Sequence, residues 1–365
     1  MTGIFDYLVW RGDISMDVCP FNEIDGVILA RFSYLPFEAA FDFSAGIYFT
    51  VGEISEKLLA VQNIDHLVRL ADDVKLMEAL MDSERFNKIK IFDYVNRLSE
   101  EVQLQFSAIT AKLSDERLYI AFRGTDNTII GWKEDFNMCF VCPIQSQVLA
   151  AEYLERCGHK SSGSIIVGGH SKGGNLAVYA ATFCDRSVQD RITNVYNFDG
   201  PGFDEKVLRT DGYKRICARV QTFVPQSSIV GMLLEHEEEY TIVHSARKNG
   251  LWQHDVYSWE VKRNHFICLE TVNNSSKFID FTLKAWIAEL DYDKREQLVD
   301  TVYAVLNKTQ ANTIRELNES KFSNAVVIVK SIKDLDEPTK RVVIQSIKSL
   351  VRVAKQGAMI AIKNR

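Results

Sequence analysis

The 365-residue sequence has no uninterrupted apolar run near the roughly 20 residues that a helix needs to cross a bilayer. Its first residues, Met1 to Tyr7, also lack the cationic head and the apolar stretch of a secretory signal peptide. From both absences we expect a cytoplasmic protein.

An excess of positive charge is missing too, because 43 Lys and Arg stand against 49 Asp and Glu, for a formal net charge of −6. A surface for nucleic acid ordinarily needs a cationic excess, so we expect no nucleic-acid partner. Hydrophobic residues make up 46% and charged residues 25%, which is typical of a folded protein and argues against disorder.

The seven cysteines are odd in number and irregularly spaced, which fits a reducing compartment better than a disulfide framework. Cys139 and Cys142 have the spacing of half a zinc site or of a redox motif. The other half is missing and the residues between them are apolar, so we interpret both as buried thiols. A His-Glu-x-x-His helix is absent as well, and the sequence predicts no metal and no other cofactor.

The segment Gly168–Gly174 lies between an apolar, strand-like run and the helical run Asn175–Phe183. A serine on a sharp strand-to-helix turn holds its hydroxyl clear of the backbone, and the residues two before and two after it must be small. The pattern Gly169-x-Ser171-x-Gly173 therefore predicts a nucleophile elbow with Ser171 as the nucleophile. The alternative is a glycine-rich connection with an incidental serine, and the flanking strand and helix argue against it.

Strand signals alternate with helical segments through the middle of the chain, at 105–113, 118–122, 164–167, 194–198, 218–224 and 240–243. The first two are separated by a short polar turn and predict a hairpin. The later ones are separated by segments long enough for crossovers, so we expect a mostly parallel, doubly wound α/β sheet with the antiparallel hairpin at one edge.

Both ends of the chain read as helical additions to this sheet. Apolar residues recur at helical spacing in 22–37, 53–61, 64–81, 278–290, 293–306 and from 313 onward, with a break at 336–338. We expect a helical N-terminal cover over residues 1–100 that is part of the core domain, the α/β core over 101–275, and a helical C-terminal extension over 276–365.

A serine nucleophile needs a base within hydrogen-bond reach and an acid that orients the base, and in this architecture the chain order is serine, acid, histidine. Asp199 ends the strand 194–198, and the turn Gly200–Gly202 after it would lift the carboxylate over the C-terminal edge of the sheet. We assign Asp199 as the acid. The alternative is that it caps a helix or satisfies turn amides.

Four histidines follow the elbow. His236 lies in a run of glutamates and reads as solvated surface, while His244 and His265 continue strand-like or apolar segments. His254 stands in a loop after the last strand signal, with aromatic neighbours that would keep water from the imidazole, and we assign it as the base. The alternative is that it merely bonds Asp255. His170 is adjacent to Ser171 but should point away from it.

The oxyanion that forms on the substrate carbonyl needs hydrogen-bond donors. Lys172 would supply one through its backbone N–H, and the second donor in this architecture comes from the loop after an earlier strand. The segment Phe122–Asp126 ends the strand 118–122 at the right place, with Gly124 allowing close approach and Thr125 offering its N–H and hydroxyl. The alternative is an ordinary strand-end turn.

Two groups of motifs resemble the lipase class 3 branch of the α/β-hydrolases: Ala121–Thr125, Gly131, Trp132 and Asp135, and then Gly169–Gly174. Within that branch the chain is similar to an uncharacterised bacterial family of α/β-hydrolase-like proteins known only as a domain of unknown function. The segments that carry this likeness are Tyr7–Asp13, Asn197–Gly202, Val224–Gly231 and Gln253–Asp255, and it covers roughly residues 1–270.

The resemblance implies an α/β-hydrolase fold and a serine hydrolase, with Ser171 as the nucleophile and Thr125 in the oxyanion hole. Class 3 lipases usually carry the acid after the next strand, where Phe223–Ser228 has no carboxylate, so the acid assignment stays with Asp199, in a setting similar to pancreatic-type lipases. Lys172, where many lipases have leucine, would add a cation at the mouth of the site and favour an anionic or polar acyl substrate.

We therefore expect a serine hydrolase that cleaves carboxylic esters, including those of lipids, through an acyl-enzyme on Ser171, with a small-molecule acyl or lipid substrate. The alternatives are a thioesterase, acyltransferase or peptidase with the same triad of Ser171, Asp199 and His254, because this fold hosts many acyl-transfer reactions. A non-catalytic binding module is a third alternative.

The last 28 residues contain seven Lys or Arg and no Asp or Glu, in contrast to the acidic chain as a whole. Five apolar residues form one helical stripe there: Val343, Ile347, Leu350, Val351 and Ala354. We expect a terminal helix docked on the protein by that stripe. The alternative is a basic amphipathic helix that makes a peripheral contact with an anionic membrane surface or a partner.

Overall fold

The computed structural model describes residues 3–43, 47–113, 117–126, 128–138, 140–248, 250–309, 311 and 321–363. The chain divides into two compact units. The sheet unit comprises Met1–Arg97, Phe106–Gly124 and Ser146–Val272, and the helical unit comprises Leu98–Gln105, Thr125–Gln145 and Asn273–Arg365. The helical unit thus includes two segments, Leu98–Gln105 and Thr125–Gln145, that the sequence assigned near or within the α/β core.

The largest sheet has the strand order β1-β2-β3-β4-β5-β6-β7-β8-β11. Its strands are β1 Phe49–Thr50, β2 Lys90–Ser99, β3 Leu104–Lys112, β4 Leu118–Phe122, β5 Ile165–His170, β6 Ile192–Phe198, β7 Val220–Pro225, β8 Tyr240–Val243 and β11 Cys268–Leu269. The run from β4 to β8 is parallel, and β3 pairs with β4 antiparallel, as the sequence predicted. The predicted position of this hairpin at one edge is wrong, because β2 and β1 extend the sheet beyond β3. A separate antiparallel pair joins β9 Val261–Lys262 to β10 His265–Phe266.

The central strands β4 and β5 are buried along their whole length, which is why they read as continuous apolar runs. Strand β2 was not predicted. It lies near the sheet edge, pairs with only two residues of β1, and is exposed or half-exposed at nearly every position. Because neither face is fully buried, its sequence shows no clean apolar alternation. The turn predicted at 114–116 lies outside the described residues.

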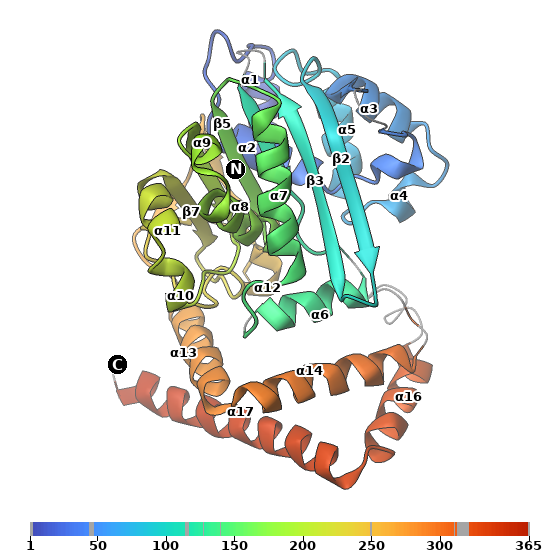
Figure 1. Ribbon diagram of the computed structural model, residues 1–365, viewed down its shortest axis with the longest axis vertical. Coiled ribbons are helices and arrows are strands. Elements are labelled where there is room, and N and C mark those ends of the chain that lie inside the picture. Colours follow the sequence, from blue (N-terminus) through green and yellow to red (C-terminus); the bar gives the residue numbers. More distant parts are fainter. Residues whose placement is uncertain are drawn as a thin grey trace. The chain divides into compact units, whose positions relative to one another are not determined.

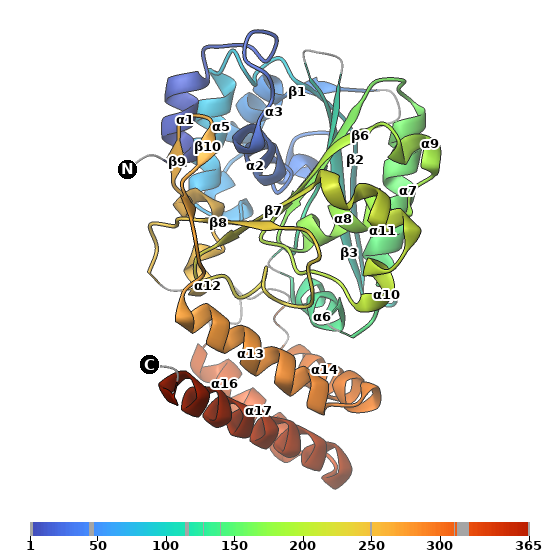
Figure 2. The same cartoon turned by 90° about the vertical axis from the view of Figure 1, so that its left-hand side faces the viewer.

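Helices cover both faces of the sheet (Figures 1 and 2). One face carries α2 Glu23–Phe32, which packs on β4, β5 and β6, and the other carries α8 Lys172–Phe183, which packs on the same strands. The other helices of the sheet unit are α1 Ile4–Arg11, α3 Val51–Leu59, α4 Ile64–Leu67, α5 Asp72–Met81, α7 Gln145–His159, α9 Arg186–Gln189, α10 Glu205–Leu208, α11 Asp211–Ile216 and α12 Gly250–Gln253, with 3-10 turns at Phe37–Ala39, Cys217–Arg219 and Val256–Ser258.

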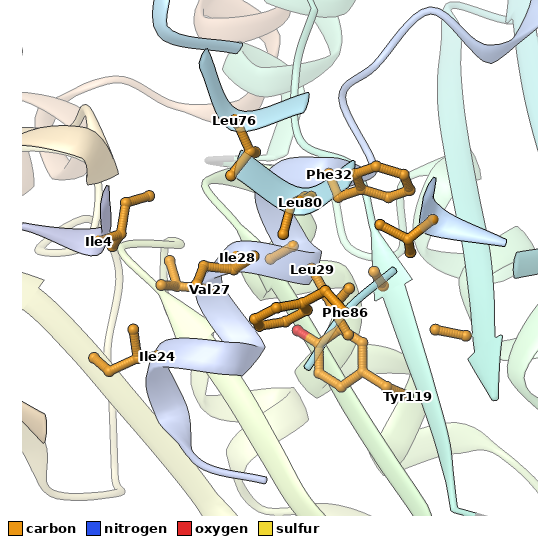
Figure 3. Packing of buried hydrophobic residues seen from close by; sticks show 14 of the residues in the cluster. Ile4, Ile24, Val27, Ile28, Leu29, Phe32, Leu76, Leu80, Phe86 and Tyr119 are labelled. Atoms are coloured by element: carbon orange, nitrogen blue, oxygen red, sulfur yellow. The ribbon is translucent and has the colours of Figure 1, made fainter. Parts of the chain in front are cut away.

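Helix α2 is the centre of the main hydrophobic core, and all but its first residue are buried. Figure 3 shows Leu76 and Leu80 of α5 beside it, with Tyr119 of β4 close by. The Tyr119 hydroxyl donates to the carbonyl of Gly26 at 2.7 Å. Arg31 forms a bidentate pair with Asp73 of α5, in which each of the two hydrogen bonds is 2.6 Å long. A helix buried on all sides needs such internal partners for its polar groups.

The described helices of the helical unit are α6 Ile129–Met138, α13 Asn274–Glu289, α14 Tyr292–Asn307, α16 Lys321–Lys333 and α17 Glu337–Lys363. The predicted break at 336–338 corresponds to the α16–α17 junction, while residues 313–320 lie outside the described residues. Helix α17 packs on α13 and α14.

The predicted stripe matches the face of α17 that packs inward only in part, since Val343, Leu350 and Ala354 are half-buried. Ser346 and Val353 are buried at 1% exposure each, whereas Ile347 and Val351 of the predicted stripe are 55% and 48% exposed. The Trp286 indole N–H donates to the carbonyl of Ser346 at 2.9 Å, which holds the small residue against α13. A docked face that includes a serine has no apolar signal at that position, so the prediction was wrong for Ile347 and Val351.

Candidate active site

Ser171 is the residue between β5 and α8, at the N-cap of that helix, with φ 61° and ψ −134°. A positive φ is unusual for a serine and marks a sharp, strained turn. The turn leaves no room beside it: a Cβ on Gly169 would lie 2.2 Å from the Gly173 carbonyl oxygen, and one on Gly173 would lie 2.1 Å from the Phe122 carbonyl oxygen. The glycines at both positions are therefore a steric requirement of the elbow.

The loop after β4 approaches the elbow closely. A Cβ on Gly124 would lie 2.5 Å from the His170 carbonyl oxygen and 3.1 Å from the Ser171 Cβ. It would also lie 2.2 Å from the Tyr34 hydroxyl, which donates to the His170 carbonyl at 3.1 Å. Gly124 thus brings backbone next to Ser171, as the sequence predicted for this position.

Asp199 directly follows β6 and is fully buried, with φ 53°. One carboxylate oxygen accepts hydrogen bonds from the Ser228 hydroxyl at 2.5 Å and from the Gly231 N–H at 3.1 Å. The other oxygen lies 2.6 Å from His254 Nδ1. A buried carboxylate is stable only when its oxygens are satisfied in this way, so the surroundings hold it in one orientation.

His254 follows α12, and its side chain is 18% exposed. Its Nδ1 faces Asp199, which leaves Nε2 on the opposite side of the ring. Asp255 instead accepts from the backbone N–H of Tyr257 at the start of a 3-10 turn, so the alternative partner of His254 has another role. Among the described residues the Ser171 hydroxyl has no hydrogen bond, including none to His254; such bonds often form only with substrate bound.

His170 lies beside His254, with ring centroids 4.5 Å apart. Its Nε2 is 2.8 Å from the backbone carbonyl of His254, and its Nδ1 is 3.3 Å from the Tyr34 hydroxyl. Burial, with the nearby His254 and Arg31, holds the pKa of His170 well below its usual value. The ring is therefore neutral and donates from Nε2, because a carbonyl can only accept. The sequence did not predict this contact.

Other contacts fix the loop that carries His254. The Gln253 side-chain oxygen accepts from the Ser227 N–H at 2.7 Å, and the Trp259 indole donates to the Gln253 carbonyl at 2.7 Å. The Tyr257 hydroxyl donates to Asp73 at 2.7 Å. Each of the residues 253, 254 and 257 is thus held by a buried or half-buried partner, as a precisely oriented side chain requires.

The two predicted oxyanion donors have different surroundings. Lys172 is the first residue of α8, where backbone N–H groups point out of the helix. Its side chain is 2% exposed, so the prediction of a cation at the mouth of the site is wrong. Thr125 follows Gly124 in the chain, and within the helical unit its hydroxyl donates to Asp135 at 2.5 Å. That leaves its backbone N–H as the group to consider for an oxyanion.

The prediction that His236 is solvated is wrong, because its side chain is only 7% exposed. Its Nδ1 lies 2.9 Å from Glu238 and its Nε2 lies 2.8 Å from the Gly231 carbonyl, so this histidine supports the loop whose N–H reaches Asp199.

Burial alone raises the pKa of Glu238, but His236 and the hydroxyls of Thr222 and Tyr213 bring it down to about 2. His244 and His265 pair with Glu260 and Glu23.

Within the described part of the chain, no three His, Cys, Asp or Glu side chains gather as a metal site would require. Cys139 lies outside the described residues, and Cys142 is exposed, so the prediction of a buried thiol is wrong there. No helix among the described residues is long and apolar enough to span a bilayer.

The class that these features define is a mixed α/β protein with a large, mostly parallel sheet, consistent with an α/β-hydrolase-like fold. The chain belongs to the Mbeg1-like family, which matches residues 80–304. This range begins later and ends later than the roughly 1–270 of the expected resemblance.

Two solved structures similar to this chain are lipases. A Rhizomucor miehei lipase in complex with its propeptide is 19% identical with a TM-score of 0.32, over 46% of this chain and 58% of its own. The M37 lipase is 16% identical with a TM-score of 0.35, over 57% of this chain and 69% of its own. The chain thus spans less than two thirds of the first lipase. No curated protein matches it.

Proposed function

We propose that the protein is a serine hydrolase that cleaves carboxylic esters, including lipid esters, through an acyl-enzyme on Ser171. The observation that carries the proposal is the 2.6 Å contact between Asp199 and His254 Nδ1, on a chain that also holds Ser171 at a strained strand-to-helix turn. An ordinary turn serine needs neither a positive φ nor a histidine paired with a buried carboxylate nearby.

In the proposed reaction the Ser171 oxygen attacks the ester carbonyl while His254 Nε2 takes the hydroxyl proton. Asp199 stabilises the imidazolium that forms and fixes its tautomer through Nδ1. Backbone N–H groups of Lys172 and Thr125 are the proposed donors to the oxyanion.

The tetrahedral intermediate collapses, the C–O bond to the alcohol breaks, and His254 returns the proton to the leaving oxygen. Water then attacks the acyl-enzyme with His254 as base, which releases the acid and restores Ser171. Thioesters, amides or a second acyl acceptor fit the same steps, so thioesterase, peptidase and acyltransferase reactions are the alternatives.

A fluorophosphonate probe tests the proposal, because it forms a covalent bond only with an activated serine. The wild-type protein should be labelled at neutral pH and Ser171→Ala should not. Ser187→Ala, which changes an exposed serine on α9, should label like wild type. A wild-type protein that stays unlabelled while folded would favour a non-catalytic binding module.

A further inference from the structure

One face of α17 exposes apolar side chains to solvent. Ile344, Ile347 and Val351 are 45%, 55% and 48% exposed. They recur at positions i, i+3 and i+7 and so form one stripe along the helix. The opposite side, with the buried residues Ser346 and Val353, is the side that packs.

Cations lie on the same exposed face. Lys348 is four residues after Ile344, Lys355 is four after Val351, and Arg341 is three before Ile344, and all three are exposed. Residues at these separations are neighbours on a helix surface. Within the described part of the chain these three cations have no carboxylate partner, unlike Arg352, which pairs with Glu289 at 2.6 Å.

The neighbouring helix α16 repeats the pattern. Val326, Val329 and Ile332 are 68%, 52% and 41% exposed at positions i, i+3 and i+6. Lys330 and Lys333 are exposed in the last turn of the same helix. Two consecutive helices of the helical unit therefore each present apolar and cationic residues to solvent, in a chain whose net charge is −6.

We propose that the exposed apolar and basic stripes of α16 and α17 bind an anionic phospholipid surface. A helix that lies in a membrane interface inserts short apolar side chains between headgroups while its lysines reach out to the phosphates. The local excess of cations supplies the attraction to anionic lipid. Each Lys or Arg near the surface strengthens the partition of the protein onto the membrane about fivefold.

The charges on these helices argue against two other occupants of the stripes, a partner protein and a second copy of this chain. The buried centre of a protein interface is depleted of charged residues, whereas here lysines lie beside the apolar stripe itself. A second copy of this chain would bring the same cations against one another in a two-fold contact. Neither cost applies at a negatively charged lipid surface.

Flotation of the full-length protein with lipid vesicles tests the proposal. The protein should float with vesicles of phosphatidylcholine and phosphatidylglycerol, remain behind with phosphatidylcholine alone, and detach at high salt. Lys348→Glu with Lys355→Glu should weaken partition at least about 25-fold, from about fivefold per lost cation. Ile347→Asp should weaken it about tenfold or more, because it places a charge in the inserted stripe.

The matched control is Lys206→Glu with Lys214→Glu, two exposed lysines of the sheet unit, which should float like wild type. Circular dichroism checks that each variant is folded. Ser171→Ala should bind vesicles as well as wild type, so loss of hydrolase activity and loss of membrane binding are separable.

Three results would overturn the proposal. They are wild-type protein that ignores anionic vesicles, equal binding to phosphatidylcholine alone, and helix variants that bind as wild type does. Sedimentation gives a fourth: a wild-type dimer that Ile347→Asp dissociates, without any change in vesicle binding, would assign the stripe to a second copy of the chain.

Discussion

The imidazole of His170 donates from Nε2 to the backbone carbonyl of His254 across 2.8 Å, so the residue before the proposed nucleophile holds the proposed base. The two rings also lie 4.5 Å apart at their centroids. Because His170 is part of the elbow strand, the contact ties the loop of His254 to the turn that carries Ser171. Preorganisation of this kind keeps reacting groups in place before substrate arrives.

Replacing His170 with Phe should lower kcat for a p-nitrophenyl ester about 10- to 100-fold with KM nearly unchanged, because a misplaced base slows the chemical step. His170→Gln retains an N–H donor and should recover part of the loss. Steady-state kinetics over pH 5 to 9 check both variants. A change in KM alone, or a Gln variant no better than Phe, would contradict a positioning role.

Asp199→Asn should lower kcat by about 10⁴-fold while the protein stays folded, because an amide favours the wrong tautomer of His254 and cannot stabilise the imidazolium. The matched control is Asp255→Asn, one residue after His254. Its carboxylate accepts a backbone hydrogen bond from Tyr257, which an asparagine can also accept, so kcat should stay within about twofold. Equal rates for the two variants would remove Asp199 from the proposed triad.

Ser228→Ala should reduce kcat about tenfold, because the hydroxyl that donates to Asp199 at 2.5 Å is lost and the carboxylate gains freedom to turn. Thr182→Val is the control, since it removes a buried hydroxyl that donates to the Val178 carbonyl at 2.8 Å, far along α8 in sequence. Both variants should lose stability in urea unfolding, but only Ser228→Ala should lose turnover. If the two lose kcat equally, the effect is on folding alone.

The parts of the candidate site that follow strand ends were accessible from sequence, because a strand end has a local signature. Ser171 and Asp199 each directly follow a buried parallel strand, and glycines mark the turns after both. His254 required elimination among four histidines, and its contact with Asp199 spans 55 positions of sequence.

Residues that support the site from a distance were not accessible in this way. Tyr34 lies after α2 and contacts His170 136 positions away, and nothing in its neighbours predicts that contact. Ser228 lies in the segment Val224–Gly231 that carried the family resemblance, so the only signal for it was the resemblance itself. The lone histidine in a glutamate run, His236, gave the wrong signal because its partner Glu238 is turned inward and buried.

Glu238 should make the stability of the protein sensitive to acid. Its pKa falls from 4.5 to about 2 on folding, although burial opposes the shift, because His236, Thr222 and Tyr213 all contact the carboxylate. As pH falls, Glu238 therefore takes up a proton near pH 4.5 in the unfolded chain but only near pH 2 in the folded chain. The stabilisation is complete above pH 4.5, declines as pH falls through this window, and amounts to roughly 3 kcal/mol.

Glu238→Gln should abolish this part of the pH dependence. Urea unfolding at pH 6 and pH 3 measures it: the wild type should lose more stability on acidification than the variant, by roughly 1–3 kcal/mol. Glu239→Gln, at the exposed neighbouring position, should keep the wild-type dependence. Because the same loop reaches Asp199 through the Gly231 N–H, Glu238→Gln should also lower kcat at pH 7. Parallel curves of unfolding free energy against pH for the wild type and Glu238→Gln would show that the buried carboxylate is not the acid-sensitive group.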